Sequence, residues 1–246
     1  MKILITNDDG INATGIYILL ETLIKYFTKF ENTTIKVVAP SLEMSAVSHK
    51  LTLREGLFIK KENDLIEGIE TYSVTGTPAD CVKVAFDHLK YDADIVFSGV
   101  NKGFNVGNDI LYSGTIAAGF EANLNKKLAI TMSCDNNTFE GTKNITKVLE
   151  FLETKKELLE NNICVININL PVNGKNIVFT KQGRLPFDSQ YYLKEDGLYY
   201  LEGTPAPNQP ENDIYTDVYN VYNNNISISF LTSDRTDYQM LAKFNK

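Results

Sequence analysis

Short apolar runs alternate with helical patterns along most of the chain. Apolar runs at residues 3–5, 35–38, 95–97 and 128–133 and an alternating run at 164–170 have the length and side-chain types of buried strands. Between the first two runs, apolar residues recur at the spacing of one helix face, at Ile16, Leu19, Leu20, Leu23, Ile24 and Phe27. Strands that alternate with helices predict an α/β protein in which helices cover both faces of a mainly parallel sheet, a three-layer αβα core.

The pattern changes towards the C-terminus. Further strands are expected around Leu51, Leu53, Leu57 and Ile59, and at residues 71–74, with helices after Pro78 and at residues 116–122 and 145–159. After residue 170, strands at 177–180, 190–193, 198–201 and 226–230 have few helical neighbours, and residues 194–197 resemble a hairpin turn. We therefore expect one α/β domain over residues 1–246, with a core at about 1–180 and a projecting β-rich arm and tail at about 181–246.

The first strand ends at Asn7-Asp8-Asp9-Gly10, which places two carboxylates in succession. Ligand sites of parallel α/β sheets lie beyond the carboxyl ends of the strands. Successive side chains of a strand point to opposite faces, so Asp8 and Asp9 can reach one ion only where the chain has left the strand, and Gly10 permits that bend. The alternative is an ordinary Asx-Gly turn in which an aspartate caps the following helix.

Three more junctions carry small oxygen-bearing residues: the loop with Ser45, the glycine-rich segment with Asn101 and Asn105, and the turn Ser113-Gly114-Thr115. In a doubly wound sheet these junctions share an edge with Asp8, and such oxygens suit a hard cation such as Mg²⁺ or Mn²⁺. The turn at 113–115 also offers free N–H groups at a helix start, where a phosphoryl group is stabilised. Simple N-capping and left-handed turn residues are the alternatives.

Composition narrows the function classes. The 246 residues carry a formal net charge of -7, which argues against nucleic acid or an anionic membrane as the main partner. The two histidines, His49 and His88, are too few for a His-rich dinuclear centre, and their scarcity argues against a Ser-His-Asp hydrolase. The cysteines Cys81, Cys134 and Cys164 are widely spaced, which indicates buried thiols rather than disulfides or a zinc site. No secretory or membrane-spanning pattern is evident, so a cytoplasmic location is expected.

Taken together, five motifs resemble the SurE survival-protein family: residues 7–10, Val38-Ala39-Pro40 followed by Ser45, residues 76–81, residues 98–105 and residues 112–115. The resemblance implies a Rossmann-like core and a divalent-metal-dependent 5′-nucleotidase. Such an enzyme hydrolyses nucleoside 5′-monophosphates, with 3′-monophosphates and short polyphosphate as further substrates. It also implies a homodimer or homotetramer formed through a swapped C-terminal arm.

Carried over by motif, the resemblance places one Mg²⁺ or Mn²⁺ per subunit on Asp8, Asp9, Ser45 and Asn101. Phosphate contacts fall on Asn101, Asn105 and the turn Ser113-Gly114-Thr115. We expect metal-activated water to attack phosphorus, with Asp9 preferred as the base and Asp8 as the firmer ligand. His49 is interpreted as an exposed loop residue. The rival hypotheses are a receiver-like Mg²⁺-binding module and a nucleotide sensor without catalysis.

Overall fold

The computed structural model describes residues 1–135, 138–160, 163–185, 187–205 and 212–244. Within these ranges nine strands form one sheet in the order β3-β4-β2-β1-β5-β6-β7-β11-β8. The strands are β1 (Lys2–Thr6), β2 (Thr34–Pro40), β3 (Ile59–Lys61), β4 (Thr71–Val74), β5 (Ile95–Lys102), β6 (Leu128–Cys134), β7 (Val165–Leu170), β8 (Ile177–Thr180) and β11 (Ile226–Leu231). Only the pairings β3–β4 and β7–β11 are antiparallel among the pairs of this sheet. The mainly parallel sheet confirms the predicted fold class.

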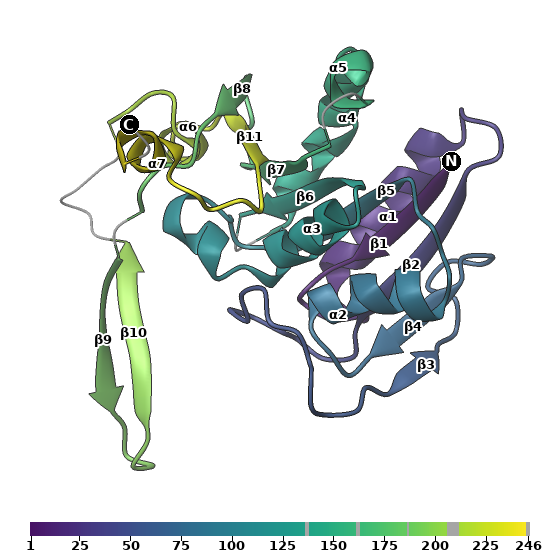
Figure 1. The fold of residues 1–246 in the computed structure, drawn as a ribbon, viewed down its shortest axis with the longest axis horizontal. Coiled ribbons are helices and arrows are strands. Elements are labelled where there is room, and N and C mark those ends of the chain that lie inside the picture. The colour runs from purple at the N-terminus through teal and green to yellow at the C-terminus, as the bar shows by residue number, and fades with distance from the viewer. Residues whose placement is uncertain (136–137, 161–162, 186, 206–211, 245–246) are drawn as a thin grey trace.

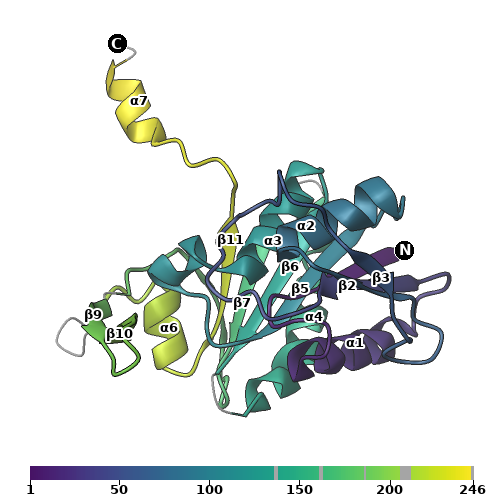
Figure 2. The same ribbon diagram turned by 90° about the horizontal axis from the view of Figure 1, so that it is seen from below.

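Helices lie on both faces of the sheet, as Figure 2 shows from below. On one face are α1 (Thr14–Phe27) and α4 (Ile145–Glu153), and on the other are α2 (Pro78–Lys83) and α3 (Gly114–Leu124). The shorter helices are α5 (Lys156–Glu160), α6 (Asp217–Tyr222), α7 (Tyr238–Phe244), a π-helix at Val84–His88 and 3₁₀ helices at Gly107–Leu111 and Glu140–Asn144. The helix expected over 145–159 is therefore two helices, α4 and α5, separated at residues 154–155.

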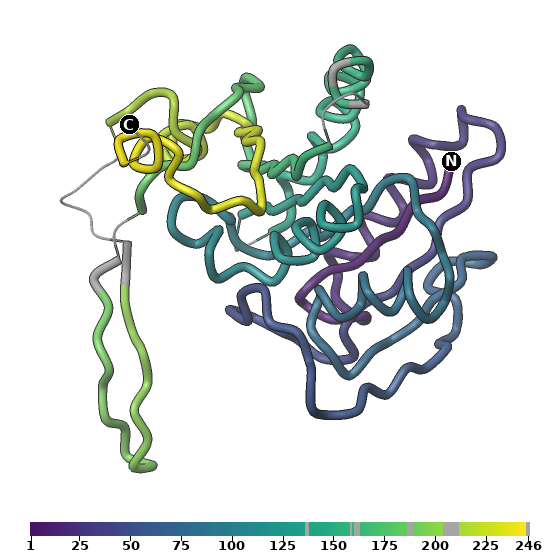
Figure 3. The backbone as a smooth tube through the Cα atoms, viewed as in Figure 1, coloured from purple at the N-terminus to yellow at the C-terminus, as the bar shows by residue number. Residues whose placement is uncertain are grey.

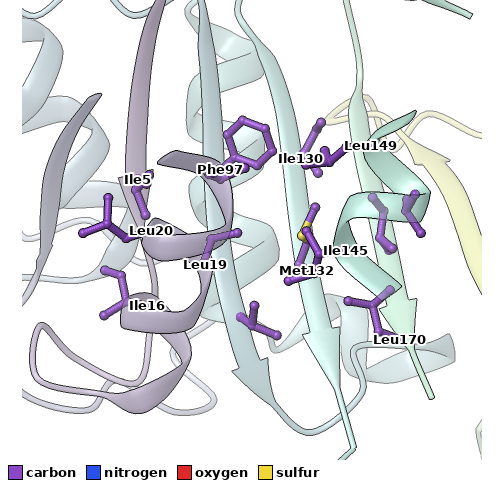
Figure 4. Packing of buried hydrophobic residues seen from close by; sticks show 14 of the residues in the cluster. Ile5, Ile16, Leu19, Leu20, Phe97, Ile130, Met132, Ile145, Leu149 and Leu170 are labelled. Atoms are coloured by element: carbon purple, nitrogen blue, oxygen red, sulfur yellow. The ribbon is translucent and has the colours of Figure 1, made fainter. Parts of the chain in front are cut away.

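Two apolar clusters hold the layers together. The larger packs α1 and α4 against one sheet face, where Leu19, Phe97 and Met132 are fully buried (Figure 4). The smaller packs α2 and α3 against the other face through Leu4, Val96 and Ile116. Burying these side chains supplies the main stabilisation of the fold. All three cysteines are free thiols, and Cys81 and Cys134 are buried as the sequence predicted, whereas Cys164 is only half-buried.

The strand expected around Leu51, Leu53 and Leu57 is wrong. Residues 51–58 form no strand, and Leu53 is 85% exposed. The backbone N–H and the hydroxyl of Thr52 both donate to the Asp80 carboxylate, at 3.1 and 2.7 Å, so this segment bonds to a helix start instead of a neighbouring strand. Pairing with β4 begins only at Ile59.

The C-terminal part leaves the sheet and then returns to it. Strands β9 (Phe187–Leu193) and β10 (Tyr199–Pro205) form an antiparallel hairpin that projects far from the sheet in Figure 1, as predicted for the arm. The trace in Figure 3 shows the same hairpin standing apart from the rest of the chain. Beyond it, β11 joins the main sheet between β7 and β8, and α7 follows at the end of an extended tail (Figure 2).

Candidate metal-phosphate site

The four predicted junctions meet at the carboxyl ends of β1, β2 and β5. Hydrogen bonds between distant segments hold them together. The Met44 N–H donates to the carbonyl of Asp8 at 2.7 Å, and the Ser48 N–H donates to the carbonyl of Tyr112 at 2.8 Å. The Lys102 N–H approaches Oδ2 of Asp9 at 3.4 Å. The side chains predicted from four separate motifs therefore share one edge of the sheet, which we call the site edge.

Asp8 is the most constrained residue of the site edge. It is buried, and its two carboxylate oxygens accept hydrogen bonds from Thr115, 2.5 Å from the hydroxyl to Oδ1 and 3.1 Å from the N–H to Oδ2. Burial raises the pKa of Asp8 to about 6; the Thr115 hydrogen bonds lower it and the charge of Asp9 raises it. The sequence predicted Thr115 as a phosphate contact, whereas its N–H and hydroxyl here orient Asp8.

Asp9 is half-buried and less constrained. Burial raises its pKa, the N–H of Lys102 counteracts that rise, and the charge of Glu43 adds to it. Gly10, which follows, adopts φ +98°, in the region that favours glycine. This bend is the one expected where the chain leaves β1. It lets two successive carboxylates serve the same edge.

Residues 41–50, the Ser45 loop, lie over this bend. Ser45 is exposed and its hydroxyl donates to Glu43 at 2.6 Å. Glu43 therefore joins the site edge as a third carboxylate that sequence reasoning missed. The only sequence signal for it was its place two residues before Ser45 in a loop already singled out. His49, expected to be exposed, is instead partly buried and paired with Glu121, so that interpretation is wrong.

Asn101 and Asn105 differ in their surroundings. Asn101 is half-buried, and its side-chain nitrogen donates to the Gly103 carbonyl at 2.7 Å. Asn105 is buried: its side-chain nitrogen donates to the Ser133 hydroxyl at 2.8 Å, and its N–H donates to Asn169 Oδ1 at 2.9 Å. Asn105 thus ties the glycine-rich loop to β6 and β7, whereas Asn101 is only half-buried at the site edge.

At the start of α3, Ser113 caps the helix by accepting the Ile116 N–H at 3.1 Å. The Ser113 N–H donates to the Asp109 carbonyl and the Thr115 N–H to Asp8. Among the hydrogen bonds of the described residues, the Gly114 N–H has no acceptor. A Cβ on Gly114 would lie 3.0 Å from the Asp8 Cβ, so glycine is needed for this close approach.

The donor set fits a hard divalent cation. In the described part of the chain, no Lys or Arg forms an ion pair with Asp8, Asp9 or Glu43, and the charge of Lys102 acts on Asp9 only from beyond ion-pair distance. Among the described residues, no group of three His, Cys, Asp or Glu side chains lies close enough together to hold a metal ion. Neutral oxygen atoms would therefore have to complete the coordination of the ion. Burial raises the pKa of nearby Cys134 to about 12, and the charges of Asp135 and Asp9 add to that rise, which disfavours a thiolate ligand.

Comparison with known proteins shows the family to which the chain belongs. A family model described as Survival protein SurE matches residues 3–189. The chain belongs to the SurE family. A 5′-nucleotidase SurE of Clostridium botulinum (strain 657 / Type Ba4) is 39% identical over 99% of this chain and 97% of its own length, and one of Clostridium beijerinckii is 36% identical over 100% and 98%.

The solved structure of a SurE protein from Aquifex aeolicus superposes with a TM-score of 0.77 at 28% identity. It covers 100% of this chain and 98% of its own. The SurE fold therefore extends over the C-terminal part, where the sequence motifs are sparse. Among the described residues, no helix is long and apolar enough to cross a membrane.

Proposed function

We propose that this SurE-family protein is a divalent-metal-dependent phosphomonoesterase that releases phosphate from nucleoside 5′-monophosphates. The observation that carries the proposal is the site edge itself: within the described residues, carboxylates that form no ion pair with Lys or Arg lie beside a helix start that has an unused N–H. The full-length relatives named 5′-nucleotidase support the substrate class. Nucleoside 3′-monophosphates and short polyphosphate are proposed as further substrates.

Asp8, Asp9, Ser45 and Asn101 would hold one Mg²⁺ or Mn²⁺ per subunit. When bound, such an ion polarises phosphoryl oxygens and lowers the pKa of a coordinated water. Asp8 would be the fixed ligand, because Thr115 orients both of its oxygens. Asp9 is less constrained and would accept a proton from the attacking water. Ser45 would exchange its hydrogen bond with Glu43 for coordination.

The substrate phosphate would bind where the protein offers uncommitted donors. The Gly114 N–H lies at the start of α3, where a helix stabilises an anion. It is joined by the Asn101 side chain, which would turn from the Gly103 carbonyl. Ser113 and Asn105 would act behind this surface by capping α3 and fixing the glycine-rich loop. These donors stabilise the charge that develops on the phosphoryl oxygens during displacement.

We further propose a homodimer or homotetramer assembled through the C-terminal arm, in the cytoplasm. Tyr191, Leu193, Tyr199 and Leu201 are all more than half exposed, and cross-strand pairing puts them on one face of the hairpin. A contiguous exposed apolar surface of this kind is typical of an interaction site. The described residues of α7 include no buried side chain, so it also lacks packing within its own subunit.

The receiver-like alternative is not favoured, because β5 passes through Ser98 and reaches Asn101 without an aspartate to accept phosphate. The test is a panel of nucleoside 5′- and 3′-monophosphates assayed for phosphate release with Mg²⁺ or Mn²⁺. We expect turnover that excess chelator abolishes and added metal restores. Turnover that persists in chelator would refute the metal mechanism. Tight nucleotide binding without phosphate release would favour the sensor.

A further inference from the structure

Glu121 is a buried carboxylate that the proposed chemistry does not use. It lies on α3, seven residues after Gly114 and so about two helical turns away on a similar face. Its side chain is only 5% exposed. A charged group buried to this degree is costly unless it is paired, so its partners indicate why it is there.

Two basic side chains approach Glu121 from different segments. His49 Nε2 lies 3.1 Å from Oε2, and Lys83 Nζ of α2 lies 3.5 Å from Oε1. The ring of His49 also stacks on Phe120, with centroids 6.4 Å apart and planes at 30°. Burial raises the pKa of Glu121, but the hydrogen bond with His49 and the charge of Lys83 outweigh it, and the net pKa is lowered. Glu121 is therefore an ionised anchor.

The segment that Glu121 holds is the Ser45 loop. His49 lies four residues after Ser45, and its contact with Glu121 is the only ion pair that this loop makes within the described residues. The other anchors are backbone groups of the loop: the N–H groups of Ser41, Met44 and Ser48 donate to the carbonyls of Val74, Asp8 and Tyr112, and the Lys50 carbonyl accepts from the Thr77 hydroxyl at 2.7 Å. Helix α3 thus contacts Asp8 at its first turn and the Ser45 loop at Glu121.

We propose that Glu121 is a positioning residue that acts through His49 to hold the Ser45 loop over Asp8, in the arrangement that a divalent metal requires. This inference rests on the proposed function, because it takes Ser45 and Asp8 as metal ligands. One rigid helix then fixes two ligands from different junctions. The partners of ligating groups commonly control metal affinity by about 10- to 100-fold, which sets the expected size of the effect.

The test is direct Mn²⁺ binding, followed by the electron paramagnetic resonance signal of free Mn²⁺, on the full chain with Glu121→Gln and His49→Gln. Glutamine keeps the length of Glu121 but removes its charge. We expect each variant to bind Mn²⁺ about 10-fold or more weakly than the wild type. The metal concentration for half-maximal turnover should rise in parallel, while kcat at saturating metal should change less. The double variant should lose little beyond either single variant, because both act through one contact.

Asp87→Asn is the matched control. Asp87 is an exposed partner of the same Lys83, at 3.7 Å, and touches no part of the Ser45 loop, so its Mn²⁺ affinity should equal that of the wild type. If Glu121→Gln does not fold, the Mn²⁺ affinity of His49→Gln decides the test, because the side chain of His49 is more exposed than that of Glu121. Wild-type Mn²⁺ affinity in the folded variants, with only thermal stability reduced, would overturn the proposal. A wild type that binds no Mn²⁺ would instead refute the proposed function on which it rests.

Discussion

The site edge and the C-terminal hairpin differ in where their residues find hydrogen-bond and packing partners. At the site edge, segments more than 100 residues apart bond to one another, as Asp8 does with Thr115. In the hairpin, β9 pairs only with β10 among the described residues, and Tyr191 and Tyr199 remain about two-thirds exposed. Contacts within one subunit therefore arrange the site edge, whereas they leave one face of the hairpin exposed.

The largest effect is expected when a charge is removed from the site edge. Asp8→Asn keeps the shape of the side chain but removes an anionic ligand. We expect kcat/KM for a nucleoside monophosphate to fall by about 10³-fold, which corresponds to a loss of about 4 kcal/mol of transition-state stabilisation. Phosphate release at saturating Mn²⁺ measures it. Circular dichroism should show an unchanged fold, and retained turnover would remove Asp8 from the mechanism.

A smaller effect is expected from the group that orients Asp8. Thr115→Val removes the hydroxyl that lies 2.5 Å from Oδ1 but keeps the backbone N–H. We expect kcat/KM to fall about 10-fold, since partners of ligating carboxylates are typically worth that much. Thr131→Val is the matched control, because Thr131 is also a buried threonine bonded to one side chain, Asn167 at 3.0 Å. If both variants lose activity equally, Thr115 has only a packing role.

The raised pKa of Asp8 predicts that the carboxylate proposed to bind metal also lowers the stability of the metal-free fold. Its folded pKa of about 6 lies above the ordinary value of 3.8, so ionised Asp8 destabilises the metal-free fold, and that loss develops as pH rises from about 4 to about 6. Metal-free Asp8→Asn should therefore exceed the metal-free wild type in free energy of unfolding by about 1–3 kcal/mol at pH 8, the lower figure allowing for one lost hydrogen bond. Urea unfolding in EDTA measures this.

The difference should shrink at pH 4, where Asp8 is protonated in the folded wild type. A variant that is less stable than the wild type at pH 8, or a gap that does not change with pH, would contradict the prediction. The raised pKa would then not reflect an unfavourable buried charge at the site edge.

Much of the site edge was predictable because parallel strands end together. Asp8, Asp9 and Asn101 each follow or end an apolar run, so the topology alone brings them to one edge. The use of each donor was not predictable. Whether the Thr115 N–H meets a phosphate or Asp8 depends on how closely α3 approaches β1, and local sequence does not encode that distance.

Dependence on distant partners also explains three other features that the sequence did not predict. Leucines at alternating positions 51, 53 and 57 have the pattern of a strand. The N–H and hydroxyl of Thr52 instead donate to the Asp80 carboxylate, so this segment does not pair with a neighbouring strand. Asn167 and Asn169 alternate with the apolar residues of β7, and both are buried and donate to the Asn105 carbonyl, a contact that the alternating pattern does not specify. His49 pairs with the buried carboxylate of Glu121, which lies 72 residues further along the chain. Each outcome depends on a partner far along the chain.

The smallest effect on catalysis is expected from changes in the hairpin, which should alter assembly instead. Tyr191→Ser combined with Tyr199→Ser removes two exposed aromatic rings from one hairpin face. Because large exposed aromatic side chains dominate interfaces, the mass of the assembly measured by light scattering should fall. kcat/KM per subunit should stay within about two-fold, since no hairpin residue bonds to the site edge within the described chain. Tyr192→Ser, on the opposite hairpin face, is the control. An unchanged assembly would show that the hairpin face is not the contact, and a large loss of activity on dissociation would show that a neighbouring subunit completes the site.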